Sequence, residues 1–338
     1  MRISPILISL LGGFALLLFC LVPGVFAEEN QGTFPVRSLH MIETDNAGEK
    51  LAYPSTIYYD PEGDEIYITD SAKGQIVICA ADYFPQLAVG KGRGLYSIYS
   101  SYAKGDKIYF CVGVSEKNQK GHIAVYSQAL LPEKKIYFSG FPGADNFQPR
   151  EMVIGKDGLM YVVGINETAV IVLDQEGNYL REILPLDEML GVPEEAEIYS
   201  LTQDENGRLY FLSEALGRVY VYDQDENFLF KFGEKGGGRG KLARPRGIAA
   251  DAKNDRVFVV DYLRHTVSAY TTAGDYLFEF GGIGYSRGWF YFPTDVAVDG
   301  HGHALITDTF NHRVQVFKVI ERADEDEPLL VVPATKTP

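Results

Sequence analysis

Residues suited to recognition chemistry recur at one position of a repeated sequence pattern. In chain order, this position holds Ser55, Tyr96, Arg150, Tyr199, Arg246 and Thr294. A guanidinium fork can bind a carboxylate or phosphate through two hydrogen bonds, and a tyrosine offers a flat, amphipathic contact surface. We therefore predict that these six residues form a binding face for an anionic peptide segment or a small anion. The alternative is that they only pack against neighbouring loops.

Two carboxylates follow the same position by one residue, Glu151 and Asp295. Carboxylates placed there could act as a general acid or help to hold a calcium-type cation. Two of them are few for either role, and no nucleophile–base set or cofactor motif accompanies them. We therefore expect no catalytic residue, no metal and no cofactor, and we keep an enzyme as the alternative.

Two pairs of histidines could each hold a metal ion of borderline hardness. His301 and His303 flank a glycine in an expected hairpin turn, and His265 and His312 occupy equivalent loop positions in neighbouring repeats. We expect neither pair to have a carboxylate or thiol close by. Exposed turn histidines are therefore the prediction.

Other reactive side chains fit structural roles. Asp70, Asp261 and Asp308 each end the second strand of a repeat before a tight loop, where a carboxylate caps the turn. Cys79 and Cys111 both lie in apolar runs. This setting favours buried free thiols over a disulfide, although export would permit one.

The pattern that positions these residues occurs six times. Its first strand is centred, at intervals of 41 to 54 residues, on Ile57, Ile98, Met152, Leu201, Ile248 and Val296. Each copy continues into a polar turn and a short strand of alternating apolar residues, too short for a helix, with further strands behind it. Several strands in each repeat of this length predict an all-β fold, a propeller with six four-stranded antiparallel blades.

The last copy lacks a fourth strand, because the sequence becomes acidic after Ile320. A segment with the fourth-strand pattern, PVRSLHMIET from Pro35, precedes the first copy instead. We predict that this N-terminal segment completes the last blade. Closure of this kind leaves no open seam in the ring.

The repeats resemble the NHL repeat, the unit of six-bladed propellers in many exported bacterial proteins. The resemblance rests on Pro293, Val298-Asp299, Ile306-Thr-Asp308 and Asn311-His-Arg313-Val-Gln-Val-Phe317. It implies an exported scaffold or recognition module. The amidating lyases, propeller enzymes similar to this repeat, bind zinc through histidines in Pro-His strand starts, and this chain has no histidine at that position.

Residues 1–27 have the features of a signal peptide. Arg2 supplies a positive start, an apolar run covers residues 6–22, and small residues precede a cleavage point before Glu28. We predict export to the periplasm or the extracellular space. An uncleaved membrane anchor is the alternative, because the apolar run is close to spanning length.

The rest of the chain divides into one propeller, residues 28–320, and an acidic flexible tail, residues 321–338. The formal net charge is −15 at pH 7. A surface this acidic repels phosphate backbones, so nucleic acid is excluded as a partner. We expect a monomeric propeller that is not inserted in a membrane once the signal peptide is removed.

These observations predict an exported, non-catalytic binding or scaffold module that presents one propeller face to a protein or peptide partner. A subunit of a cell-envelope complex is one form of this role. The alternative is a propeller enzyme of the lyase or lactonase type with a metal in the central channel.

Overall fold

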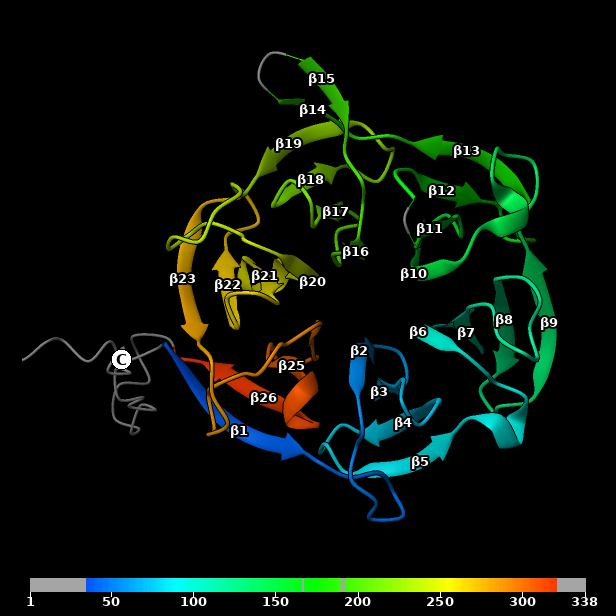
Figure 1. Ribbon diagram of the computed structural model, residues 1–338, viewed down its shortest axis with the longest axis horizontal. Coiled ribbons are helices and arrows are strands. Elements are labelled where there is room, and N and C mark those ends of the chain that lie inside the picture. Colours follow the sequence, from blue (N-terminus) through cyan, green and yellow to red (C-terminus); the bar gives the residue numbers. More distant parts are fainter. Residues whose placement is uncertain (1–34, 166, 190–191, 321–338) are drawn as a thin grey trace, which may run out of the picture.

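The computed structural model describes residues 35–165, 167–189 and 192–320 of the chain. Six four-stranded antiparallel sheets stand around a central axis as the blades of a propeller (Figure 1). The innermost strands of successive blades contact one another around the whole ring. The predicted all-β class, blade number and strand number are confirmed.

The blades follow the sequence repeats in order. Blades 1 and 2 consist of β2 (Pro54–Asp60), β3 (Glu65–Asp70), β4 (Gln75–Ala80), β5 (Pro85–Val89), β6 (Ile98–Lys104), β7 (Lys107–Val112), β8 (His122–Ser127) and β9 (Pro132–Tyr137). Blades 3 and 4 consist of β10 (Pro149–Ile154), β11 (Met160–Gly164), β12 (Val170–Leu173), β13 (Tyr179–Ile183), β16 (Ser200–Gln203), β17 (Leu209–Ser213), β18 (Arg218–Tyr222) and β19 (Phe228–Phe232). Blades 5 and 6 consist of β20 (Pro245–Asp251), β21 (Arg256–Asp261), β22 (Thr266–Tyr270), β23 (Tyr276–Gly281), β24 (Val296–Val298), β25 (Ala304–Asp308), β26 (Arg313–Val319) and β1 (Val36–Ile42).

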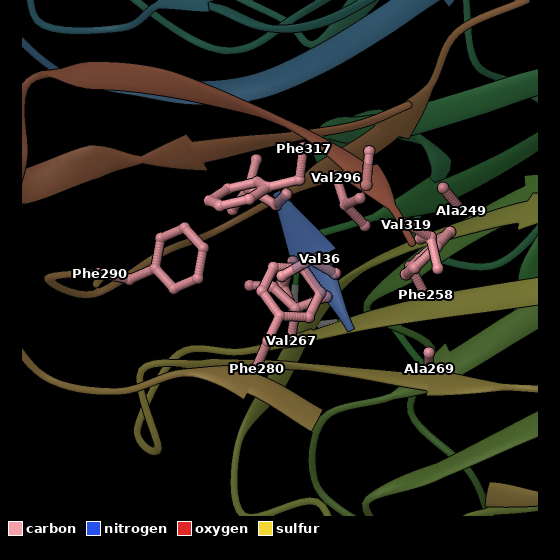
Figure 2. Packing of buried hydrophobic residues seen from close by; sticks show 13 residues of the cluster. Val36, Ala249, Phe258, Val267, Ala269, Phe280, Phe290, Val296, Phe317 and Val319 are labelled. Atoms are coloured by element: carbon pink, nitrogen blue, oxygen red, sulfur yellow. The ribbon is translucent and has the colours of Figure 1, made fainter. Parts of the chain in front are cut away.

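The N-terminal strand closes the ring as predicted. β1 pairs antiparallel with β26, so that Val36 lies opposite Val319 and Ile42 lies opposite Val314. In Figure 1 the first strand, in blue, runs along the outside of the last blade, in red. Figure 2 shows Val36 among aromatic side chains of the last two blades, including Phe280. The two ends of the described chain are therefore joined by both hydrogen bonds and buried apolar surface.

Alternate residues of the middle strands serve two different blade interfaces. On β17, Leu209 and Phe211 pack into the cluster shared with blade 3, whereas Tyr210 and Leu212 pack into the cluster shared with blade 5. Successive side chains of a strand point to opposite faces of its sheet. Because both faces are covered, these strands are apolar at almost every position, and the hydrophobic core is a set of interfaces around the ring.

Two features differ from the sequence expectation. The strand pairing in blade 2 places Ser101 where blade 1 has Ile57, so the residue of this blade at the recognition position is Tyr99 and not Tyr96. The chain also adds a hairpin between blades 3 and 4, made of β14 (Leu186–Met189) and β15 (Val192–Glu195). This hairpin stands outside the ring in Figure 1, and the repeat analysis did not predict it.

The cysteines behave as predicted. Cys79 on β4 and Cys111 on β7 are free and buried. Burial raises the pKa of each thiol to about 12, so both are protonated and unreactive near neutral pH.

The predicted signal peptide (1–27) and acidic tail (321–338) lie outside the described residues. Within the described ranges, no helix combines the length and the apolar character that crossing a bilayer requires.

Candidate functional site

The inner strands of the blades run from one face of the ring to the other. We name the side where β2, β6, β10, β16, β20 and β24 begin the strand-start face, and the opposite side the strand-end face. Because the blades are antiparallel sheets, the loops between their second and third strands also lie on the strand-start face. The six predicted recognition residues belong to this face, and all six are half-buried.

Three of the six come together in one stack of cations and rings. The guanidinium carbon of Arg150 lies 3.9 Å from the centre of the Tyr199 ring. Arg246 follows, with its guanidinium carbon 5.6 Å from the same ring and 3.9 Å from the ring of Tyr262. We name these four residues the arginine–tyrosine ladder. Sequence reasoning missed Tyr262, whose place in the loop after β21 gave no signal of this contact.

One carboxylate serves the ladder. Arg246 Nε lies 3.1 Å from Glu214 Oε1, and Arg244 binds the same oxygen. Arg150 has no such carboxylate: its buried Nε finds no hydrogen-bond partner among the described residues. Arg244 and Arg246 thus share a single acid, and the Nε of Arg150 is a buried donor without a partner in the described part of the chain.

A shallow pocket of about 270 Å³ adjoins the ladder between blades 4 and 5. Tyr199, Glu214, Lys235, Arg244 and Leu263 are among its lining residues. Burial lowers the pKa of Lys235, whose Nζ donates to the backbone oxygen of Glu214. The pocket therefore combines basic groups with an apolar wall.

Aromatic rings continue from the ladder along the same face. Tyr262 lies 4.7 Å from Phe292, Phe292 lies 5.3 Å from Phe310, and Phe310 lies 5.3 Å from Tyr53, all between ring centres. Nearby, the Tyr285 side chain is 72% exposed. This strip gives the strand-start face a continuous apolar and aromatic border on blades 5, 6 and 1.

The other three predicted residues do not join the ladder. Thr294 Oγ1 donates to the backbone oxygen of Ser55 at 2.7 Å, which ties blade 6 to blade 1. Ser55 Oγ reaches the backbone oxygen of Thr69 at 3.3 Å. Tyr96 is held through its backbone oxygen, which accepts a hydrogen bond from Asn118. These contacts are structural.

The two carboxylates next to the recognition position point into the ring, and each reaches the next blade. Glu151 Oε2 accepts a hydrogen bond from the Leu201 amide at 3.2 Å, and Asp295 Oδ2 accepts one from the Ile57 amide at 2.8 Å. Burial raises the pKa of both carboxyl groups, and the charge of Glu151 raises that of Asp295 further.

The matching position of blade 5 is a glycine, Gly247. A β-carbon there would lie 2.5 Å from the α-carbon of Asp295 and 2.6 Å from its Oδ1. No side chain fits at that distance, so the close approach of the blade 6 backbone explains why blade 5 has glycine at this position.

The recurring aspartates at the ends of second strands hold lead-in segments, and the predicted capping of the following turn through its backbone amides is found at Asp261. Asp261 accepts backbone hydrogen bonds both from the loop that follows it and from the segment that leads into its blade. Asp70 binds only the lead-in segment in the same way. Asp308 binds the lead-in amide of Tyr291 and also the Arg313 side chain. These carboxylates have no capacity left for chemistry.

One expectation about the histidines was wrong, because a carboxylate does lie beside them. His303 Nδ1 is 3.1 Å from Asp299 Oδ2, and the Tyr83 hydroxyl lies 2.7 Å from both atoms. Burial alone would raise the pKa of Asp299, but hydrogen bonds from His303 and Tyr83 lower it. Within the described ranges, no three His, Cys, Asp or Glu side chains form a group that could hold a metal.

The second pair of histidines is used separately. His265 Nδ1 accepts a hydrogen bond from the Phe292 amide at 2.9 Å. His312 Nδ1 lies 2.5 Å from the backbone oxygen of Ala52. Each ring holds a different lead-in segment, so the two are not a ligand pair.

Comparison with known proteins supports the repeat and the fold. A family model described as the NHL repeat matches residues 290–317, which lie in blade 6 and its lead-in segment. No curated protein sequence matches the chain significantly.

Three solved structures illustrate the fold. A protein of unknown function from Bacteroides thetaiotaomicron superimposes with a TM-score of 0.60 at 13% identity, covering 83% of this chain and 75% of that one. Hydrazine synthase of Kuenenia stuttgartiensis superimposes with a TM-score of 0.54 at 14% identity, covering 79% of this chain and 95% of that one. Virginiamycin B lyase of Staphylococcus aureus superimposes with a TM-score of 0.53 at 13% identity, covering 84% of this chain and 100% of that one. At these identities the likeness concerns the fold alone.

Proposed function

Because this chain is a six-bladed β-propeller that carries the NHL repeat, we propose that it is a non-catalytic binding module. Its strand-start face captures an anionic segment of a protein partner. The observation that carries the proposal is the arginine–tyrosine ladder of Arg150, Tyr199, Arg246 and Tyr262 in a chain whose net charge is −15.

The chemistry of the ladder favours a carboxylate-bearing peptide. The tyrosine rings hold the guanidinium groups flat against the face, so little side-chain freedom remains to be lost on binding. The half-buried guanidinium of Arg150 suits an acidic side chain. The aromatic strip and the exposed Leu263 beside the ladder suit apolar side chains of the same segment.

The experiment uses a fluorescein-labelled peptide of alternating glutamate and tyrosine, with a glutamine–tyrosine peptide for comparison. Binding is measured by fluorescence anisotropy. Replacing Arg150 and Arg246 together by alanine removes two charge-assisted contacts of about 1.5 kcal/mol each, so affinity should fall roughly 100-fold or more. The melting temperature should stay within a few degrees of the wild-type value.

The matched control is Arg181→Ala, on β13, the outer strand of blade 3. Arg181 pairs with Glu226 and is not part of the ladder. This variant should leave peptide binding unchanged. Equal binding of the glutamine peptide, or full binding by the double variant, would contradict the proposal.

We also propose that the module acts outside the cytoplasm, on the strength of residues 1–27. Protein recovered from the envelope or medium should begin at Glu28, which intact mass would measure. A product that keeps its first 27 residues in the membrane fraction would favour the anchored alternative.

A lyase is the second candidate function, favoured by one observation: Glu151 is a buried carboxyl group whose pKa is raised to about 7, a value useful to a general acid or base. The metal expected for such an enzyme has no fitting three-ligand group among the described residues, so no step is assigned to it. Stoichiometric calcium or zinc in purified protein would favour this candidate over the binding module.

A further inference from the structure

The centre of the ring holds a cavity of about 380 Å³. Every inner strand contributes at least one apolar or aromatic side chain to its wall, among them Ile57, Tyr102, Met152, Leu201, Ile248 and Val296. Its volume falls in the range of small-molecule sites, and its lining is mainly apolar.

The cavity opens toward the strand-end face. Pro61, Glu205, Lys253 and Gly300 line it, and each lies in a turn that follows an inner strand. Of the described residues that form its lining, none belongs to the arginine–tyrosine ladder. The cavity is therefore separate from the site proposed above.

The carboxyl groups of Glu151, Glu205 and Asp299 line this cavity, and Glu151 is the one of the three that lies within an inner strand. It lies in the interior of the ring, yet its side chain keeps partial access to solvent, and it lines the cavity. Among the described residues, the Leu201 amide is the one group that donates a hydrogen bond of good geometry to it, at Oε2. The nearby Ser200 hydroxyl is fully buried and makes no well-formed hydrogen bond. Glu151 thus has an oxygen available to a ligand.

Asp295 is the buried acid of the opposite blade, and both of its oxygens already accept backbone hydrogen bonds. Its Oδ2 accepts from the Ile57 amide at 2.8 Å and its Oδ1 accepts from the Val296 amide at 2.9 Å. Asp295 belongs to blade 6 and Glu151 to blade 3, which stand opposite each other in a ring of six. Because burial and the charge of Glu151 raise the pKa of Asp295, Glu151 is the carboxylate of this pair that would bind a cation.

We propose that this cavity is a binding site for a small aliphatic molecule with one terminal ammonium group. The ammonium binds Glu151, and the hydrocarbon body lies against the apolar wall. A carboxylate ligand would be repelled by Glu151 and by Asp299, whose carboxylate also lines the cavity, and a neutral molecule would leave the charge of Glu151 unpaired. A bare metal ion would find no third protein ligand among the described residues and would leave the apolar wall unfilled.

Burial and neighbouring groups set the charge of Glu151. Burial raises its pKa to about 7, while the Ser200 hydroxyl, the Leu201 amide and the charge of Arg150 oppose that rise. Asp295 is the acid coupled to it electrostatically, and the buried Cys111 thiol feels its charge. The carboxylate form, which the ammonium requires, is therefore present above neutral pH and lost below it.

The test uses three probes of one size: hexylamine, hexanol and hexanoate. The amide resonance of Leu201 reports on the site, because this amide donates to Glu151. Nuclear magnetic resonance titrations at pH 8 should give hexylamine an affinity roughly tenfold above that of hexanol, since charge-assisted hydrogen bonds are about twice as strong as neutral ones. Hexanoate should not shift the resonance.

Two further measurements separate the site from general attraction of amines to an acidic protein. Hexylamine stays protonated between pH 6 and pH 8, so the fall in affinity over this range, about tenfold for an acid with pKa near 7, reports on the protein. Glu151→Gln should weaken hexylamine binding about tenfold at pH 8 and abolish this pH dependence. Glu182→Gln, at an exposed glutamate of the same blade, should change neither.

The pH series uses the wild-type protein, so the test does not depend on whether a variant folds. A preference for hexylamine, lost with Glu151→Gln and below neutral pH, supports the site. Equal affinity for hexanol, unchanged binding to Glu151→Gln, or shifts of Leu201 produced by calcium but not by hexylamine would each overturn it. Neither result depends on the peptide experiment, so the two proposals fail independently.

Discussion

Closure of the ring by β1 makes a specific prediction about stability. The Ile42 side chain is 2% exposed and packs with Leu51, Ile57, Leu305 and Val314, where blades 6 and 1 meet. Removing a buried side chain of this kind costs about 2–5 kcal/mol, because both transfer energy and packing are lost. We therefore expect Ile42→Ala to lower the free energy of unfolding by about 3 kcal/mol.

The size of the propeller converts this loss into a temperature. Unfolding entropy of about 2.1 cal/mol/K per residue gives roughly 0.6 kcal/mol/K for roughly 290 residues, so the melting temperature should fall by about 5 °C. Urea titrations followed by circular dichroism, together with thermal scans, measure both quantities.

The matched control is Leu87→Ala on β5, the outer strand of blade 1. Leu87 is 41% exposed, so its truncation should cost less than about 0.5 kcal/mol. If Ile42→Ala proved no more destabilising than Leu87→Ala, the N-terminal strand would not stabilise the closed ring, and the reasoning would fail.

Three further predictions concern the ring and its thiols. Gly247→Ala should destabilise the protein by about 1–3 kcal/mol in urea titrations, because its β-carbon would overlap backbone of blade 6, whereas Gly237→Ala, with open space around it, should not. Burial raises the pKa of Glu151 from its ordinary 4.5 to about 7, so the folded state holds this proton more tightly than the unfolded chain. Wild-type stability should therefore fall as pH rises from 4.5 to 7, and Glu151→Gln should flatten that fall; a parallel pH profile would refute the assignment. Cys79 and Cys111 should resist a thiol reagent at pH 8 until urea unfolds the protein, and rapid labelling of the native state would contradict their burial.

The fold was predictable because each level of the sequence points to the same architecture. Alternating apolar residues identify strands, and the six copies identify blades. The segment Val36–Ile42 has an outer-strand pattern that fits the one blade lacking such a strand. The hairpin Leu186–Glu195 escaped prediction because it lies between two repeats, where the repeat supplies no template.

The candidate sites were only partly predictable, because their geometry depends on contacts between repeats. The shared position of Arg150, Tyr199 and Arg246 placed them on one face, and their stacking follows from neighbouring blades. Tyr262 joins them from a loop, and nothing in its local sequence marks that contact. Similarly, the sequence shows Glu151 as an acid beside the start of an inner strand. The cavity that it lines opens toward the strand-end face, and this opening depends on how the six inner strands are arranged.

The six repeats can be compared to show which residues the fold requires in several blades and which positions vary. Aspartates at the ends of second strands, such as Asp261 and Asp308, recur because each one fixes the loops of its own blade. The strand position that follows the recognition position differs from blade to blade and holds Thr56, Ser100, Glu151, Ser200, Gly247 and Asp295. A propeller therefore does not require an acid at this position. The two acids stand on opposite blades, where burial disfavours their charged forms, and a cationic ligand between the apolar walls would stabilise the charged form of Glu151.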